Sequence, residues 1–258
     1  MASPKVVVVD GLIAAGKSAL ISKCLAPKLR EKGFVVVEVL EPVDLWKSSG
    51  LLQKFYDDPS RYGFQFQTFV FHTRVRACQN AVKKAKAQGI TPDMYLLERS
   101  VFDDRMFMLM LLESGKIEQH EYDTYMDLWT MRRENMPFDI DLFIYLKPSV
   151  DETMKRLHVR NRSEESGVSR EYQEGLQCKH DEFLNGLYIS GSRNGVPDPT
   201  LEDIVGTPIL HFTTNDNFIE DESVKEELTL ALIREFGQVE RISANSGDIP
   251  TSSTCTIE

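Results

Sequence analysis

The sequence predicts an α/β fold in which a five-stranded parallel sheet is covered by helices on both faces. Short apolar runs alternate with helix-forming segments five times along the 258 residues. The first run, Val6–Val9, is wholly β-branched and leads into Gly-x-x-x-x-Gly-Lys-Ser at residues 11–18. Later runs end in charged residues, and ligands of open α/β sheets bind at the carboxyl ends of strands. We expect one domain over residues 1–236.

The loop after the first strand has the composition of a phosphate-binding loop. Gly11 and Gly16 let the backbone adopt left-handed turns, so that consecutive amides can face an anion at the start of the next helix. Lys17 can then reach the outer phosphates of a nucleotide, and the Ser18 hydroxyl can hold Mg²⁺. An ordinary glycine turn is the alternative, but all four fixed positions of the motif are filled. The residues predicted to bind the triphosphate here are Gly11, Ala14, Ala15, Gly16, Lys17 and Ser18.

The next segments predict two more strands and four helices. Strands are expected over 34–40 and 93–98, and helices over 19–32, 63–88, 102–113 and 118–135. Pro27 lies inside the first helical pattern and should kink or split it. Glu41 follows the second strand, and Glu98 and Arg99 end the third. Because the carboxyl ends of parallel strands meet at one edge, these charged groups should lie together.

An arginine-rich segment follows the fourth strand. Ser149 is suited to cap a helix on which Arg156 and Arg160, four residues apart, share a face. Arg162 follows in a polar stretch, and three arginines beside a flexible segment suit a lid over about 160–170 that closes on phosphate. A solvated helix end is the alternative, and the phosphate-binding loop favours the lid.

The rest of the chain completes the predicted sheet. Strands are expected over 140–146 and 207–212, helices over 170–184 and 219–236, and a surface loop over about 186–206. Residues 237–258 are rich in Ser, Thr and Asn with little to bury, so we expect a disordered tail.

The composition excludes several classes of protein. The chain has 30 basic and 40 acidic residues and a net charge of −10, which argues against a general nucleic-acid or acidic-membrane surface. Its four cysteines are scattered, so neither a zinc site nor a disulfide framework is predicted. No apolar run approaches the roughly 18 residues of a membrane span. The few residues before Val6 leave no room for a targeting peptide, so we expect a cytoplasmic protein that binds neither nucleic acid nor membrane.

Several groups of residues, in order along the chain, resemble the motifs of the deoxynucleoside kinases. They are the loop at 11–18, Glu41-Pro42-Val43 with Trp46, Phe66-Gln67-Thr68 with Arg74 and Arg76, Glu98-Arg99-Ser100 with Asp104-Arg105, and Arg156-x-x-x-Arg160-x-Arg162. The resemblance covers about residues 5–236 and is strongest to the deoxycytidine and deoxyguanosine kinase branch. It implies a P-loop kinase fold that transfers the γ-phosphoryl group of ATP, or another nucleoside triphosphate, to the 5′-hydroxyl of a deoxyribonucleoside.

The same resemblance implies roles for the catalytic groups. Glu41 would be the general base that takes the hydroxyl proton, a role worth roughly 10² to 10⁴ in rate. Arg99 would hold the same hydroxyl and Lys17 would stabilise the phosphates, while Glu98 and Ser18 would hold Mg²⁺, largely through water. Arg156, Arg160 and Arg162 would bind ATP.

The deoxynucleoside site is likewise implied by the resemblance. The residues that would form it with Glu41 and Arg99 are Trp46, Leu52, Tyr56, Phe66, Gln67, Val70, Arg74, Asp104, Met108 and Glu171. Gln67 would hydrogen-bond the base, and Arg74 with Asp104 would form a charged pair beyond it that favours deoxycytidine and purine deoxynucleosides over thymidine. Three positions depart from the family pattern, and one of them is Cys178, which stands where a Tyr is common and loosens the pocket. Val70 stands where a smaller residue is usual, which narrows the pocket, and Met108 stands where an aromatic residue that packs on the base is usual.

Other readings are weaker. A nucleoside monophosphate kinase of the thymidylate type would need basic groups where Glu41 stands, because a carboxylate repels a second phosphate. A nucleotide-dependent switch should show Asp-x-x-Gly and Asn-Lys-x-Asp, and the chain has neither. A non-catalytic relative that only binds nucleotide is disfavoured because Lys17, Glu41, Glu98 and Arg99 are intact. The resemblance also implies a homodimer through helices 102–113 and 118–135, although their apolar faces would serve equally well as core.

Overall fold

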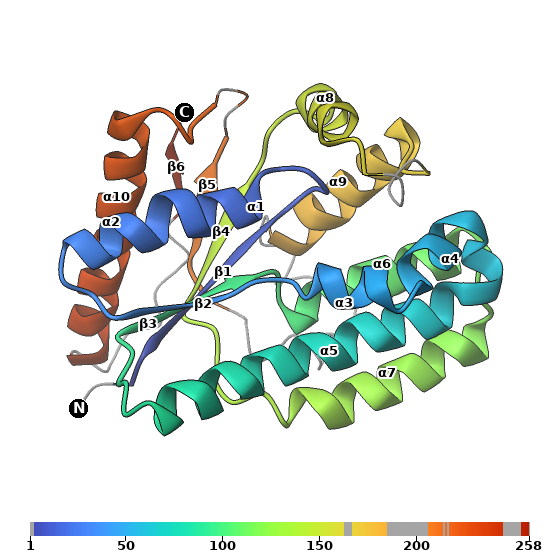
Figure 1. Cartoon of the computed structure of the whole chain (residues 1–258), viewed down its shortest axis with the longest axis horizontal. Coiled ribbons are helices and arrows are strands. Elements are labelled where there is room, and N and C mark those ends of the chain that lie inside the picture. Colours follow the sequence, from blue (N-terminus) through green and yellow to red (C-terminus); the bar gives the residue numbers. More distant parts are fainter. Residues whose placement is uncertain are drawn as a thin grey trace.

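A parallel β-sheet lies at the centre of this computed structural model (Figure 1). The structure describes residues 3–162, 167–184, 206–213, 215, 217–244 and 254–257, without the side chains of 132, 237–244 and 254–257. The strands are β1 (Lys5–Gly11), β2 (Val36–Val39), β3 (Met94–Glu98), β4 (Leu142–Leu146), β5 (Ile209–Phe212) and β6 (Thr254–Ile257). Their order is β2-β3-β1-β4-β5-β6, and all pairs are parallel. The five predicted strands and their parallel arrangement are therefore confirmed.

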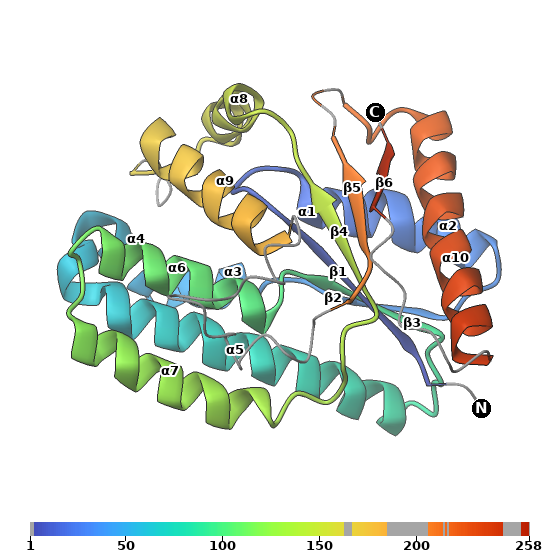
Figure 2. The ribbon, with the colours of Figure 1, turned by 180° about the vertical axis from the view of Figure 1, so that it is seen from behind.

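Helices cover both faces of the sheet, as predicted (Figures 1 and 2). They are α1 (Lys17–Ala19), the π-helical segment η1 (Leu20–Leu25), α2 (Ala26–Glu31), α3 (Val43–Ser48), α4 (Leu51–Asp57), α5 (Pro59–Ala87), α6 (Val101–Glu113), α7 (Gln119–Arg133), α8 (Val150–Arg160), α9 (Arg170–Leu184) and α10 (Glu222–Ala244). None of these described helices is long and apolar enough to cross a lipid bilayer.

Two apolar cores form because successive side chains of β1 point to opposite faces of the sheet. Val6 and Val8 pack in the core that contains residues of α3 to α7, and Val7 and Val9 pack in the core that contains residues of η1, α2 and α10. Both cores hold β1 rigidly in the middle of the sheet. The two cores therefore fix the position of the loop that follows β1 and of the strand ends beside it.

The first predicted helix is divided next to Pro27, as the position of this proline predicts. η1 ends at Leu25, and Pro27 lies in the first turn of α2, where the missing N–H of proline is tolerated. Ser149 caps α8 as predicted, because its hydroxyl accepts a hydrogen bond from the N–H of Glu152 at 3.2 Å.

The end of the chain differs from the predicted disordered tail in two places. α10 continues to Ala244 rather than ending at 236, and Thr254–Ile257 pair with β5 as a sixth strand. Gln, Glu, Arg and Ala in 238–244 favour a helix, and Thr-Cys-Thr-Ile is rich in β-branched residues. Residues 245–253 and 258, nearly all of the predicted loop at 186–206, and residues 163–166 of the predicted lid lie outside the described residues.

Candidate active site

A cavity of about 710 Å³ opens at the carboxyl edge of the sheet, beside the loop that follows β1. Most of the predicted site residues line it: Ala14, Gly16, Lys17, Ser18, Glu41, Trp46, Leu52, Tyr56, Phe66, Gln67, Val70, Arg74, Glu98, Arg99, Asp104, Arg156, Arg160 and Arg162. The residues predicted for phosphate, for catalysis and for a nucleoside therefore share one hollow. Phe55, Phe107 and Tyr172 also line it and were not predicted.

Four predicted residues do not line this cavity. Gly11 and Ala15 are buried in the loop, where the Ala15 carbonyl accepts a hydrogen bond from Arg156 Nη1 at 2.7 Å. Glu171 is exposed in the first turn of α9, and hydrogen bonds from its own backbone N–H and from Ser169 lower the pKa of its carboxyl group. Its place in the deoxynucleoside site stays a prediction.

The fourth of these residues is Met108, and here the structure corrects the prediction that it lines the nucleoside site. Its side chain is completely buried in the core beneath α5 and α7, and Phe107 lines the cavity instead. Around α6, Phe107 lies roughly 60° to one side of Asp104 and Met108 roughly 40° to the other. Both positions neighbour Asp104 on the helix surface, and only the packing of α6 decides which of them faces the cavity.

Glycine is required at both ends of the loop. Gly11 has φ +145°, and a Cβ atom there would lie 2.2 Å from the carbonyl oxygen of Leu146 on the neighbouring strand. Gly16 has φ +106°, a conformation that other residues rarely adopt. The two glycines thus permit the close turn that brings Lys17 and Ser18 to the start of α1.

Lys17 lies within the loop, and only 5% of its surface is exposed. Its Nζ donates hydrogen bonds to the carbonyl oxygens of Gly11 at 3.2 Å and Leu12 at 2.8 Å. Burial lowers the pKa of Lys17 to about 8, and the charge of Arg99 adds to this effect. A phosphate beside this ammonium group would stabilise its charged form.

Ser18 and Glu98 bring two oxygen ligands together next to the loop. The Ser18 hydroxyl donates a hydrogen bond to Glu98 Oε1 at 2.6 Å, and the backbone N–H of Glu41 donates to Glu98 Oε2 at 3.3 Å. Among the described residues, no three His, Cys, Asp or Glu side chains are grouped so that they could hold a metal. A hydroxyl and one carboxylate are ligands that suit Mg²⁺, which takes few protein ligands and keeps water and nucleotide phosphates as the others.

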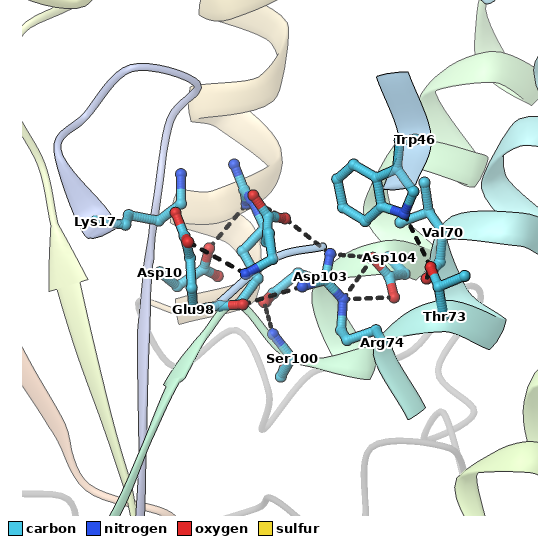
Figure 3. A network of polar contacts seen from close by, with 12 residues as sticks. Asp10, Lys17, Trp46, Val70, Thr73, Arg74, Glu98, Ser100, Asp103 and Asp104 are labelled. Atoms are coloured by element: carbon cyan, nitrogen blue, oxygen red, sulfur yellow. Dashed lines mark hydrogen bonds and ion pairs between the residues drawn. The ribbon is translucent and has the colours of Figure 1, made fainter. Parts of the chain in front are cut away.

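Arg74 of α5 lies beside Asp104 of α6 (Figure 3) and contacts both Asp104 and Glu41. Its guanidinium donates to both carboxylate oxygens of Asp104, at 2.9 to 3.2 Å, and Nη2 also donates to Glu41 Oε1 at 2.8 Å. Burial alone would raise the pKa of Glu41, but the charges of Arg74, Arg99 and Lys17 hold it below its usual range. Glu41 is therefore ionised at neutral pH, as an acceptor of protons must be.

Trp46, Phe66 and Gln67 enclose the side of the cavity next to Arg74. The Trp46 indole N–H donates to the Thr73 hydroxyl at 2.9 Å, and its ring meets that of Phe66 edge to face at 6.1 Å. Phe66, Gln67, Val70 and Arg74 lie on one face of α5 because they are spaced by three and four residues. Gln67 is only 3% exposed, so its amide is a polar group in an otherwise apolar and aromatic wall.

A second buried charge cluster lies behind Arg99. Asp10 Oδ1 accepts hydrogen bonds from the Gly11 N–H at 2.7 Å and from Arg99 Nη1 at 2.9 Å. Burial alone would raise the pKa of Asp10, but His180 and Arg99 hold it well below its usual range. Burial and the charge of Asp10 raise the pKa of Asp103 well above its usual value. A raised pKa favours the protonated form of Asp103, which can donate a hydrogen bond to the Asp10 carboxylate as an acid beside its conjugate base.

Replacing Asp103 by asparagine is expected to weaken the dependence of stability on pH. Folded Asp103 binds a proton that the unfolded chain, with the usual pKa of 3.8, releases. Its contribution to stability is fully present below that value and is lost as the pH rises toward the folded-state pKa. Asparagine keeps an acceptor for the Ser100 N–H and a donor for Asp10. Above pH 3.8 and below the folded-state pKa of Asp103, the unfolding free energy of the variant should therefore fall less steeply with pH than that of the wild type, by about 1 kcal/mol per pH unit.

Urea denaturation at four pH values in this range measures that slope, and Asp123→Asn on the exposed side of α7 is the control. Equal slopes for Asp103→Asn and the wild type would contradict a protonated Asp103.

Sequence reasoning missed three members of this cluster. Asp10 does carry a signal, because it is a charged residue that ends an apolar run directly before Gly11. Asp103 stands beside Asp104, yet its capping hydrogen bond to the Ser100 N–H is seen only in the structure. His180 is a single histidine in an ordinary helical pattern, and no feature of the sequence singles it out.

Known proteins resemble this chain over most of its length. A family model described as deoxynucleoside kinase matches residues 7–236. A probable deoxycytidine kinase of fowlpox virus is 34% identical over 233 residues, which cover 90% of this chain and 88% of the viral protein. Deoxycytidine kinase 2 of Gallus gallus is 33% identical over 250 residues, 88% of each chain. A deoxyadenosine kinase of Dictyostelium discoideum is 31% identical over 181 residues, 70% of this chain and 67% of its own length.

Proposed function

Since the chain belongs to the deoxynucleoside kinase family, whose members are ATP-dependent enzymes, we propose that it phosphorylates the 5′-hydroxyl of deoxycytidine and purine deoxynucleosides. The observation that carries this proposal is the contact of the partly buried Glu41 with the buried Arg74, 2.8 Å apart, in the same cavity as Lys17. An ionised base thereby lies between the phosphate-binding loop and a charged pair able to read a nucleobase.

The chemistry follows from the charges of these side chains. With a nucleoside between Phe66 and Arg74, Glu41 takes the proton of the 5′-hydroxyl, and Arg99, whose Nε lies 3.5 Å from Glu41 Oε1, orients that oxygen. Lys17 and the loop amides stabilise the charge that develops on the transferred phosphoryl group. Ser18 and Glu98 would hold Mg²⁺, which neutralises phosphate charge when bound. Arg156, Arg160 and Arg162 would close over the phosphates of the donor.

Arg74 and Asp104 support the preference for the base. Asp104 is a buried carboxylate whose position is set by Arg74, and a carboxylate only accepts hydrogen bonds. An exocyclic amino group on a base could donate to it, whereas the keto oxygen of thymine would meet like charge. Relatives of the chain are named deoxycytidine and deoxyadenosine kinases, which both act on bases with an amino group.

Replacing Arg74 by leucine together with Asp104 by alanine should raise kcat/KM for thymidine relative to deoxycytidine by roughly tenfold or more. Removing both residues avoids leaving Asp104 as an unpaired buried charge. The variant also loses the Arg74 contact to Glu41, which lowers kcat for both nucleosides, so the ratio of their kcat/KM values is the quantity that reports base choice. The ratio of the two kcat/KM values is the measurement, and Lys179→Leu with Glu113→Ala, which removes a more exposed ion pair, is the control. An unchanged ratio would show that the charged pair does not set base choice.

The proposed function itself is tested by offering the purified protein deoxycytidine, deoxyadenosine, deoxyguanosine, thymidine and their monophosphates with ATP and Mg²⁺. We expect the nucleosides to be phosphorylated and the monophosphates to remain unchanged. Turnover of a monophosphate alone would remove Glu41 from its role, because its carboxylate would face the acceptor phosphate.

We also propose a homodimer through α6 and α7, as the family resemblance implies. Met106 and Trp129 are buried within the chain, so such an interface would use the partly buried Leu112 and Met126. Sedimentation equilibrium measures the molecular mass, and a monomer at micromolar concentration would contradict this assembly.

A further inference from the structure

The Arg99 guanidinium contacts the side chain of His180, which does not line the cavity. We propose that His180 of α9 is a positioning residue for Arg99, acting together with Asp10, and that phosphoryl transfer depends on it. The inference rests on the proposed function, which assigns Arg99 to the reacting hydroxyl.

The contacts place His180 at the inner end of the Arg99 guanidinium. Arg99 Nη1 lies 3.0 Å from His180 Nε2 and 2.9 Å from Asp10 Oδ1, and His180 Nε2 lies 3.1 Å from that same oxygen. His180 and Asp10 are completely buried, and Arg99 is 3% exposed. The outer Nε of Arg99 lies 3.5 Å from Glu41. The Arg99 guanidinium therefore contacts His180 and Asp10 at Nη1 and lies close to Glu41, the proposed general base, at Nε.

The backbone of Arg99 explains why such a support is needed. Its φ of +62° lies in the left-handed region, which a residue with a side chain adopts only where its surroundings hold it. An arginine side chain also has many rotamers, and catalysis needs one of them. Two partners at Nη1, and the Phe107 ring 5.0 Å from the guanidinium carbon, select that rotamer.

His180 is itself held in one orientation. Its Nδ1 lies 2.7 Å from the carbonyl oxygen of Leu176, which only accepts, so Nδ1 carries a proton. The Tyr145 ring stacks on the imidazole at 6.0 Å and 9°. Nε2 is thus aimed at Arg99 and Asp10. When the imidazole is neutral, Nε2 accepts a hydrogen bond from Arg99. When the imidazole is protonated, Nε2 donates a hydrogen bond to Asp10. Nε2 therefore contacts the cluster in both protonation states of His180.

Two amide variants separate positioning from packing. In His180→Gln the amide can reach the place of Nε2, where it can accept from Arg99 and donate to Asp10. In His180→Asn the shorter amide can keep only the hydrogen bond to Leu176. We expect His180→Asn to lower kcat by roughly tenfold or more while the dissociation constant for deoxycytidine stays unchanged, and His180→Gln to keep kcat within about threefold of the wild type.

The link to Arg99 is tested by a double-mutant cycle. In an Arg99→Lys background, His180→Asn should lower kcat by much less than in the wild type, because its effect passes through the guanidinium. Thermal denaturation of each variant reports the fold. An equal effect in both backgrounds, an unchanged kcat in His180→Asn, or equal losses in the two His180 variants with a lower Tm would each overturn the proposal.

The same data distinguish this proposal from the proposed function. A wild-type protein that phosphorylates no deoxynucleoside, or an Arg99→Lys variant with full kcat, would overturn the assignment of Arg99 and this inference with it. A poorly active Arg99→Lys variant alongside a fully active His180→Asn variant would overturn the role of His180 alone.

Discussion

Replacing Lys17 by alanine is expected to lower kcat for deoxynucleoside phosphorylation by roughly a thousandfold or more. Phosphoryl transfer leaves little covalent chemistry to the protein, so catalysis depends on positioning and on charge close to the transferred group. Lys17 is a buried cation at the loop, and its two carbonyl partners hold it where phosphates would lie. Another buried cation of the cavity, Arg99, forms ion pairs with Asp10 and Glu41 and would not replace it.

Steady-state formation of deoxynucleoside monophosphate measures this loss. Lys32→Ala is the matched control, because Lys32 also lies on the segment after the loop but forms a surface ion pair with Glu226. Its kcat should equal that of the wild type, since exposed pairs contribute little. A Lys17→Ala variant with wild-type turnover would refute the phosphate-binding role of the loop.

Replacing Glu41 by glutamine is expected to lower kcat by roughly a hundredfold or more while deoxynucleoside binding stays close to normal. The amide has nearly the shape of the carboxyl group but accepts no proton at neutral pH. It also loses its ion pair with Arg74, which keeps its two hydrogen bonds from Nε and Nη2 to Asp104. Asp104 therefore still anchors Arg74 and the base site.

Kinetics and equilibrium binding of deoxycytidine, measured on one preparation, separate these two effects. Glu38→Gln is a matched control, because Glu38 lies on β2 close to the same edge and contacts Ser22 and Arg30 instead. Because the pKa of Glu41 is lowered by its cationic neighbours in the free protein, the acid limb of the wild-type kcat/KM profile should lie below the usual range of a glutamate. Unchanged turnover in Glu41→Gln would remove Glu41 as the base.

Much of the active site could be predicted because its residues stand at places that the local pattern defines. Glu41 and Glu98 end or follow strands, and parallel strands bring such ends to one edge whatever the details of packing. A similar rule of position separates Arg74 from Arg76 in the structure. They lie two residues apart on a helix, so one can be buried and the other exposed, as they are.

The remaining site residues depend on contacts between distant segments. Phe107 and Met108 are adjacent, and both fit an apolar helix face, so the choice between them follows from the rotation of α6 about its axis. His180 joins Arg99 across 81 residues of sequence. Its place was set by the packing of α9 against β4 and the loop, where Tyr145 stacks on it and Gln173 donates to the Ile13 carbonyl.

The sequence by itself determined the phosphate-binding loop, the five parallel strands and the edge at which the charged groups meet. These follow from glycine conformation, apolar periodicity and the geometry of parallel sheets, which act over consecutive residues. Only the tertiary structure decided that Arg74 contacts Glu41 as well as Asp104, and that burial beside Asp10 raises the pKa of Asp103. Those outcomes depend on burial and on distances of a few ångströms between side chains from different elements, which a pattern along one chain does not specify.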